Sequence, residues 1–206
     1  MGEIDLPLLR IIGLKGMADE AVIAGAVRTD DWAVRLQAAI GAGDLRKLPR
    51  GYALTPAART GVAEALARER AAIDPVGVAG LYERFCGLNG GFKQLMHDWQ
   101  IRTVAGAEVP NDHADAAYDA AIVARLETID AAVQPLLAEI IALVPRLAVY
   151  PARFADALAG LKGGDRAMMA RPLIDSYHTV WFELHEDLIA LSGTTRAVEA
   201  AAGRGD

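Results

Sequence analysis

The sequence predicts a mainly α-helical protein in two parts, with one small β-hairpin in the first part. Alanine and leucine dominate the composition, and both residues favour helix. Apolar residues recur at three- and four-residue spacing through most of the chain, which is the pattern of amphipathic helices. The chain has 206 residues, of which 53% are hydrophobic, so it can bury one sizeable core or two small ones.

The first part opens with predicted short helices at residues 4–16, 18–27 and 30–42. Thr29 is placed to cap the third helix, whose apolar side carries Trp32 and Leu36. Two short strands are predicted next, at Leu45–Lys47 and Tyr52–Leu54, around a Pro-Arg-Gly turn. Thr55 and Pro56 then begin a further helix that ends near residue 72, since threonine caps helices and proline suits their first position.

This order of elements is that of a winged-helix domain. The stretch Leu45-Arg-Lys-Leu-Pro-Arg-Gly-Tyr-Ala-Leu-Thr-Pro-Ala-Ala-Arg59 resembles the wing and its exit in that family. The resemblance implies a winged-helix fold for residues 1–73.

Binding of DNA by this part depends on few side chains. A recognition helix normally carries cationic or amide side chains that reach base edges and phosphates. The predicted one begins Thr29-Asp-Asp-Trp and offers only Arg35 and Gln37, while the wing adds Arg46, Lys47 and Arg50. Residues 1–70 hold ten Lys and Arg against nine Asp and Glu, a net charge of about +1. These five residues are therefore either a DNA-binding set or a solvated surface.

The second part begins after a boundary at Asp74–Gly80, and residues 78–192 are predicted to form an all-α bundle of about five helices. The residues Val104–Pro110 are predicted to be a mobile connector, and 193–206 a flexible tail. The predicted helices span 78–102, a run from Asn111 to 147 that bends or restarts at Pro135, 152–161, and the segment after Arg171.

Chemistry concentrates in the segment Arg171–Ile189, which holds two of the four histidines, one of the three tryptophans and four carboxylates. On a helix its apolar residues form one broad arc, with His178 and His185 near the middle. Glu183 and Asp187 are predicted to face the other way. Two imidazoles inside an apolar stripe need partners or a ligand, because an unpaired buried polar group is costly.

A second polar group opens the helix after Asn111, and we expect it to pack face to face with Arg171–Ile189. A metal bound by histidines and carboxylates is one interpretation, but no Glu-x-x-His pair is present, and we expect no metal. A pocket for a small organic ligand is the second, and a buried hydrogen-bond network without ligand is the third. Under the pocket interpretation the substrate-binding residues are His113, Asp115, Tyr118, Asp119, Asp175, Tyr177, Trp181 and Phe182, and the catalytic candidates are His178, His185 and Glu186.

Several function classes are excluded by missing motifs and by composition. The sequence has no GxxxxGK[ST], no GxGxxG after a strand, no HExxH, no CxxC pair and no GxSxG. A single cysteine, Cys86, cannot form an internal disulfide, which favours a reducing cytoplasm. The acidic start lacks the features of a signal peptide, and no apolar run is long enough to span a membrane. The net charge of −6 makes general nucleic-acid affinity a poor expectation.

Three stretches resemble a helical module that accompanies bacterial enzymes of the pyruvate phosphate dikinase and phosphoenolpyruvate synthase type. These stretches are Leu88-Asn-Gly-Gly-Phe-Lys-Gln-Leu-Met-His-Asp-Trp-Gln-Ile-Arg102, Asn111-Asp-His-Ala-Asp-Ala-Ala-Tyr-Asp119 and Leu173-Ile-Asp-Ser-Tyr-His-Thr-Val-Trp-Phe-Glu-Leu-His-Glu-Asp-Leu188. Such enzymes use an ATP-grasp domain to load a phosphohistidine on a swivelling domain. This chain has room for neither domain, so the resemblance implies an accessory or substrate-binding subunit. ATP and magnesium would then belong to a larger partner subunit, with no cofactor on this chain.

Three functions follow from these patterns. The first is a substrate-binding subunit of a dikinase-like phosphotransferase that acts on a small organic compound, phenolic or ketone, with one histidine as general base. The second is a winged-helix transcriptional regulator whose helical part dimerises and senses a ligand. The third is a helical interaction protein without a ligand.

Overall fold

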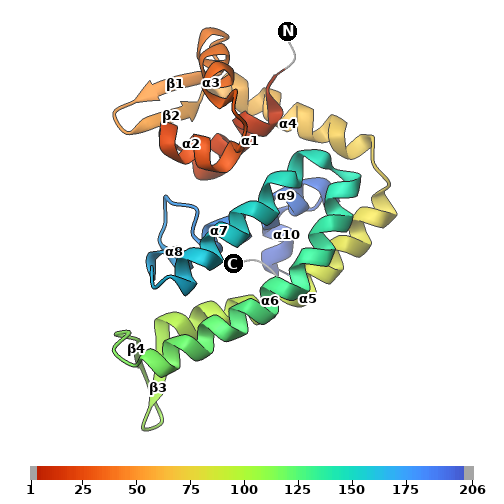
Figure 1. Cartoon of the computed structure of the whole chain (residues 1–206). Coiled ribbons are helices and arrows are strands. Elements are labelled where there is room, and N and C mark those ends of the chain that lie inside the picture. The colour runs from red at the N-terminus through yellow and green to blue at the C-terminus, as the bar shows by residue number, and fades with distance from the viewer. Residues whose placement is uncertain (1–3, 202–206) are drawn as a thin grey trace.

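The computed structural model describes residues 4–201, except for the side chain of residue 200. Its first part, here the winged-helix part, has three helices, an antiparallel hairpin and a fourth helix (Figure 1). These elements are α1 (Leu6–Lys15), α2 (Glu20–Val27), α3 (Trp32–Gly41), β1 (Leu45–Leu48), β2 (Gly51–Leu54) and α4 (Pro56–Ala71). The predicted fold class is confirmed: the protein is mainly helical, with a small hairpin after three N-terminal helices.

Local chemistry explains most boundaries of this part. Asp5, Asp19 and Thr55 each accept a hydrogen bond from the first turn of α1, α2 and α4, as capping residues do. Gly51 is needed at the hairpin turn because its φ is +142° and a Cβ there would collide with the carbonyl of Ala18. The predicted cap at Thr29 is wrong, since Asp31 occupies the cap position of α3 without a side-chain capping bond.

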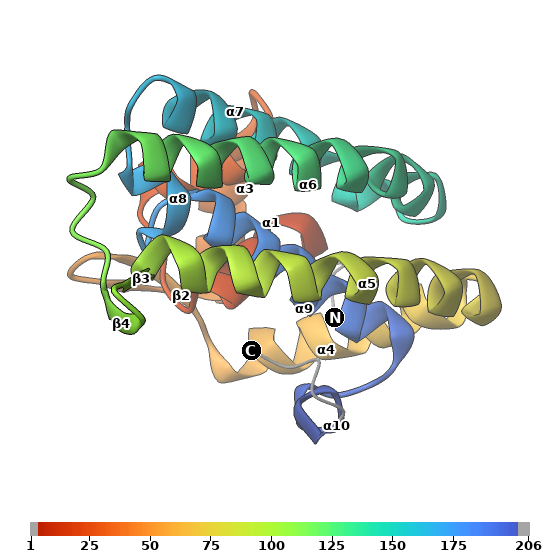
Figure 2. The same cartoon turned by 90° about the horizontal axis from the view of Figure 1, so that it is seen from below.

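The remaining elements form the bundle (residues 75–201). They are α5 (Pro75–Gln100), β3 (Ile101–Val104), β4 (Ala107–Pro110), α6 (Ala116–Leu143), the 3-10 helix η1 (Pro145–Val149), α7 (Tyr150–Lys162), α8 (Ala167–Ala170), α9 (Tyr177–Ser192) and α10 (Arg196–Ala201). Figure 2 shows α5 and α6 running alongside each other, joined at one end by the β3–β4 hairpin. Within residues 4–201 no helix is long and apolar enough to cross a bilayer.

Two local predictions for the bundle are wrong, and of the two alternatives at Pro135 a restart of the helix is excluded. Residues Val104–Pro110 are not a loose connector but belong to the antiparallel pair β3–β4, in which Ile101 pairs with Pro110. The helix α6 passes Pro135 without restarting. Pro135 and Ala131, whose carbonyl loses its usual helical donor, are both exposed, so water can satisfy that carbonyl. The last long helix begins only after its cap Ser176, because residues 171–175 form a turn.

Two hydrophobic clusters hold the chain together. One lies in the winged-helix part around Leu8, Ile12 and Leu36. The other lies in the bundle around Phe85 and Trp181. The helix α9 contacts α5, α7 and α8 in the bundle and also α1 and α4 of the winged-helix part. It is therefore the element on which the two parts meet.

Candidate functional site

The helix α9 is enclosed on nearly every side, including the side that was predicted to face solvent. Glu183 and Asp187 are 1% and 2% exposed. The prediction that these two carboxylates face away from the core is wrong, because α1 and α4 of the winged-helix part cover that face. Buried carboxylates require charged or hydrogen-bonding partners, and the structure supplies them from three other elements.

Arg153 of α7 is the centre of the first group of partners. Its Nε donates to Asp175 Oδ2 at 2.7 Å, and its Nη2 donates to Asp175 Oδ1 at 2.9 Å and Glu183 Oε2 at 2.6 Å. Lys15 of α1 reaches the same carboxylates, at 2.8 Å from Asp175 and 2.7 Å from Glu183. Two cations and two anions therefore join α1, α7 and α9, and we name these four residues the Arg153 cluster.

A second group, the Asp187 cluster, lies along the same helix. Asp187 accepts hydrogen bonds from Arg10 Nε at 2.8 Å and from the Tyr150 hydroxyl at 2.7 Å. Arg146 Nη1 lies 3.0 Å from Asp187 Oδ1, and its Nε donates to both carboxylate oxygens of Glu69 on α4. The two clusters attach the winged-helix part to the bundle through charge pairs that are largely shielded from water.

These contacts keep the carboxylates ionised. Burial alone would raise the pKa of Asp175, but the hydrogen bond and charge of Arg153 and the charge of Lys15 outweigh burial, and that pKa is lowered. Burial acts on Asp187 in the same way, and the charges of Arg146 and Arg10 lower its pKa below the ordinary value. Asp175 and Asp187 therefore act as fixed negative charges at neutral pH.

The two histidines of α9 have different surroundings. His185 is fully buried, its Nε2 lies 3.2 Å from the Tyr82 hydroxyl, and its ring lies 5.2 Å from that of Phe85. His178 is half-buried at the edge of a cavity of about 230 Å³. The cavity lies between α5 and α9 and is lined by Phe92, Lys93, Met96, His178, Trp181 and Phe182. We name it the His178 cavity; it brings together three residues of the predicted substrate-binding and catalytic sets.

Other predicted residues of this segment have structural partners. The Tyr177 hydroxyl donates to Asp130 on α6 at 2.9 Å, and burial raises the pKa of that hydroxyl. Trp181 Nε1 donates to the buried Asn89 at 2.8 Å. Glu186 accepts a hydrogen bond from Arg196 at 2.7 Å. Asp175 belongs to the Arg153 cluster described above.

The predicted polar group near Asn111 lies elsewhere. Asp119 accepts from His113 Nδ1 at 3.0 Å, and the His113 ring lies 4.4 Å from that of Trp99. Tyr118 donates to the carbonyl of Asp98, and Asp115 accepts from Arg102. These contacts are at the end of α5 that leads into the β3–β4 hairpin, around Trp99, whereas His178 lies beside Phe92 and His185 beside Phe85 on the same helix. The prediction that the two segments pack face to face is wrong, because each packs against a different level of α5.

The residues of the DNA-binding alternative are spread over two elements. Arg35 is held by Asp5, to which its Nε and Nη2 donate at 2.6 and 2.7 Å. Its pKa is raised, chiefly by that hydrogen bond. Gln37 is exposed on α3, and Arg46, Lys47 and Arg50 are exposed on the β1–β2 wing. Within α3, all of which the structure describes, the exposed positions are Ala33, Val34, Gln37, Ala38 and Gly41, and none is cationic.

In the described part of the chain no metal-binding group marks a further site, and no similarity to a known protein does so either. Among residues 4–201 no group of three His, Cys, Asp or Glu side chains is placed to hold a metal ion. Comparisons with family models, curated proteins and solved structures found no match. The resemblance to dikinase-like enzymes therefore stays a prediction.

Sequence reasoning missed the cations of both clusters and Lys93. Arg10, Lys15, Arg146 and Arg153 each stand alone among apolar residues in sequence, without a motif that marks them. The one available signal for these cations was the excess of negative charge on α9. This helix has one apolar face and one acidic face, and if both faces are buried the acidic face needs cations as partners. Lys93 was detectable as the residue that follows Phe92 on the apolar face of α5.

Proposed function

We propose that this protein is a substrate-binding accessory subunit of a dikinase-like, ATP-dependent phosphotransferase, and that its substrate is a small phenolic or ketone compound. The His178 cavity is the observation that supports this function. The larger ATP-grasp and phosphohistidine subunit, with its ATP and magnesium, rests on the resemblance of the three sequence stretches.

The shape of the His178 cavity suits a single ring. Its volume of about 230 Å³ lies below the range of roughly 300–1,000 Å³ that drug-sized ligands occupy. Phe92 and Trp181, whose rings stack on each other at 4.3 Å and 18°, form an aromatic part of the cavity lining. A ligand ring can pack against this lining while its oxygen contacts the edge of the cavity.

The polar groups of the cavity suit an oxygen on that ring. His178 and Lys93 come from facing helices and border the same space. A lysine ammonium donates to a carbonyl or phenolate oxygen, and a neutral imidazole accepts a phenolic proton. In the proposed complex His178 acts as general base on the substrate hydroxyl that the partner phosphorylates, and Lys93 stabilises the resulting negative charge.

The winged-helix part suits contact with protein rather than with DNA. The exposed residues of α3 are small, neutral or apolar, and Val34 is 72% exposed. Arg35, the one cation of this helix, is neutralised by Asp5. We propose that this face contacts the larger subunit.

Substitution of His178 by alanine is expected to weaken binding of phenol about tenfold, because one hydrogen bond to the ligand is lost. Titration with phenol and with acetophenone, followed through tryptophan fluorescence, measures the effect. His97→Ala is the matched control, since His97 is exposed and pairs with Glu108 outside the cavity. Equal affinities of the wild type and His178→Ala, or no binding of either compound, would contradict the substrate role.

The partner is tested separately. A tagged chain expressed in its own host is expected to co-purify with a larger protein that contains ATP-grasp and phosphohistidine domains. A chain that binds phenol but never associates with such a protein would remove the phosphotransferase and leave the binding site. A chain that associates with such a protein but binds neither phenol nor acetophenone would remove the substrate-binding site and leave the association with the phosphotransferase.

A second candidate function is favoured by the cations of the wing. Arg46, Lys47 and Arg50 are exposed and close in sequence, so they can contact phosphate. Under this alternative the protein is a winged-helix regulator, and a triple alanine variant weakens binding to its own promoter DNA at least tenfold and flattens its salt dependence. Electrophoretic shifts at two salt concentrations decide, and binding that is absent or unchanged in the variant excludes this function.

A further inference from the structure

A second cavity lies where the winged-helix part meets the bundle. Its volume is about 340 Å³, and it is bounded by α2, α7, α8 and the turn before α9. Gly25, Met168 and Ile174 contribute apolar walls. None of the residues assigned to the His178 cavity lines it, so the two spaces are separate.

One of the residues that line this cavity carries a buried donor that lacks an acceptor. Arg153 lines the cavity, and its side chain is 0% exposed. Its Nε and Nη2 are used by Asp175 and Glu183, but its Nη1 has no hydrogen-bond partner. An unsatisfied buried donor costs free energy, and a ligand oxygen that reaches it removes that cost.

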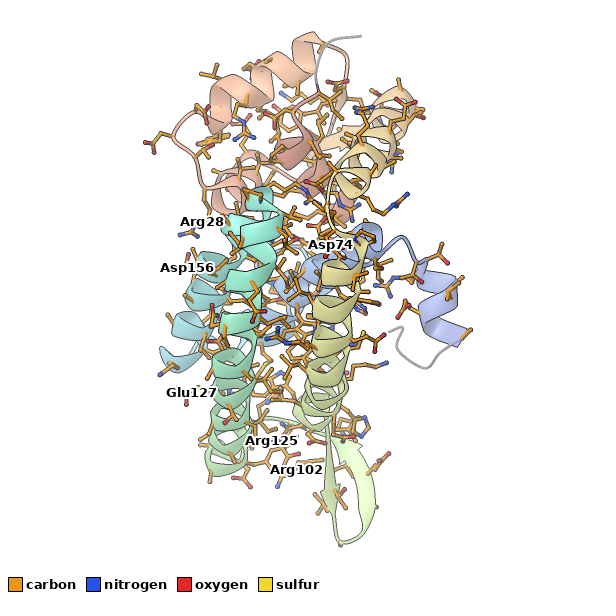
Figure 3. All side chains as sticks on the ribbon, turned by 90° about the vertical axis from the view of Figure 1, so that its right-hand side faces the viewer. Arg28, Asp74, Arg102, Arg125, Glu127 and Asp156 are labelled. Atoms are coloured by element: carbon orange, nitrogen blue, oxygen red, sulfur yellow. The ribbon has the colours of Figure 1, made fainter. Side chains whose placement is uncertain are left out.

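The rim of the cavity carries a second cation, Arg28, whose present ion pair is weak. Arg28 donates to Asp156 at 2.6 Å across the boundary between α2 and α7, and Figure 3 shows the two side chains near each other there. Asp156 is 64% exposed and Arg28 is 35% exposed, so water screens this ion pair and its contribution is small. A ligand anion can take the place of Asp156 at little cost.

The carboxylates that line the cavity do not require a cation as ligand. Asp175 already accepts hydrogen bonds from Lys15 and Arg153, and its pKa is lowered. Asp156 can turn into solvent. The cavity therefore offers donors that need acceptors and apolar walls, and no buried acceptor that needs a donor.

Two left-handed residues flank the cavity. Arg28 has φ 57° and Leu173, next to the wall residue Ile174, has φ 69°. Such backbone conformations cost free energy for residues other than glycine and cluster at ligand sites. The chain accepts this cost where it positions the rim cation and the adjacent wall.

We propose that this cavity binds a small organic monocarboxylate with an apolar body. The carboxylate accepts hydrogen bonds from Arg153 Nη1 and from Arg28, and the apolar body contacts Met168 and Ile174. Because Arg28 caps the end of α2 and Arg153 lies on α7, a ligand that contacts both arginines bridges α2 to α7. This bridge tightens the attachment of the winged-helix part to the bundle. This site does not depend on the proposed phosphotransferase function.

Gly25→Leu is the decisive variant, because Gly25 lines the cavity on α2 and nothing lies within 4 Å of an added Cβ. The leucine side chain fills the space, while the change from glycine in a helix favours folding. Gly87→Leu on α5 is the matched control, since the same addition there meets nothing within 4 Å and lies outside the cavity. Calorimetric titrations with hexanoate and benzoate, at one salt concentration, compare these variants with the wild type.

We expect both carboxylates to bind the wild type and the Gly87→Leu control, and neither to bind Gly25→Leu. Arg28→Gln weakens binding about tenfold, since it removes one charge-assisted hydrogen bond, and replacement of hexanoate by hexanamide weakens binding by more than that, since both arginine contacts lose the ligand's charge. His178→Ala leaves hexanoate affinity unchanged, which separates this site from the His178 cavity. No binding to the wild type, equal binding to Gly25→Leu, or tighter binding of inorganic phosphate than of hexanoate would overturn the proposal.

Discussion

Replacement of Arg153 by methionine is expected to lower the free energy of unfolding by about 3–5 kcal/mol. Arg153 is fully buried and is the partner shared by Asp175 and Glu183. Methionine has a similar length but no charge, so it leaves the buried carboxylate of Glu183 and the half-buried carboxylate of Asp175 with Lys15 as their remaining cation. The loss of stability comes mainly from those carboxylates, because a buried charge without a partner costs more than the pair contributes.

Urea unfolding followed by circular dichroism measures this effect. Arg84→Met is the matched control, because Arg84 forms a two-pronged contact with Glu139 on the surface, where both side chains are 51% exposed. Its loss is expected to cost less than about 1 kcal/mol. A double variant, Arg153→Met with Glu183→Gln, is expected to lose less than the sum of the two single variants, since it removes one orphaned charge. Equal costs for Arg153→Met and Arg84→Met would show that the Arg153 cluster does not hold the fold.

Asp187→Ala is expected to have a comparable effect, a loss of about 3–5 kcal/mol. Asp187 is 2% exposed and accepts from both Arg10 and Tyr150, while Arg146 lies within ion-pair distance. Its removal leaves two guanidinium groups facing each other without the anion between them. Because Arg10 belongs to α1, we also expect faster amide hydrogen exchange in the winged-helix part than in the core of α5.

Asp187 also gives the protein a defined acid sensitivity. Its pKa is lowered in the folded state, whereas an aspartate in an unfolded chain titrates near about 3.9. Its stabilising contribution is therefore complete above about pH 4 and is lost as the pH falls through the lower pKa of the folded state. Asp175 shifts in the same direction. The wild type is expected to lose stability steeply below about pH 4, and Asp187→Asn to show a shallower dependence.

Asp156→Asn is the control for both effects of Asp187, because Asp156 is 64% exposed and pairs only with Arg28 in the described structure. Its free energy of unfolding is expected to change by less than about 1 kcal/mol, with an unaltered acid transition. An acid transition in Asp187→Asn that matches the wild type would contradict the role assigned to this carboxylate.

Local signals were sufficient for the wing and the helix after it, although they misplaced the cap of α3. The Pro-Arg-Gly turn, Thr55 as a cap and Pro56 at the first helical position act on neighbouring residues only, and the structure contains all three. The hairpin β3–β4 was missed because its turn residues, Ala105 and Gly106, are flanked by strands of four residues each, too short for a clear alternating pattern.

The candidate site was predicted in part. The apolar arc of α9 correctly placed His178, Trp181 and Phe182 on a side that faces another helix, since the spacing of apolar residues determines which side is buried. The facing helix is α5, which contributes Phe92 and Lys93 to the cavity. The sequence had instead predicted that the segment after Asn111 faces α9. Periodicity shows which face is covered but carries no information on which helix covers it.

The sequence by itself determined the helices, the wing and the apolar side of α9, because these follow from interactions within a few residues. Only the tertiary structure decided that the acidic side of α9 is also buried. Its partner Lys15 lies 168 residues from Glu183, and Arg10 lies 177 residues from Asp187. A carboxylate on a helix favours solvent unless a cation meets it, and the fold of the whole chain brings those cations to α9.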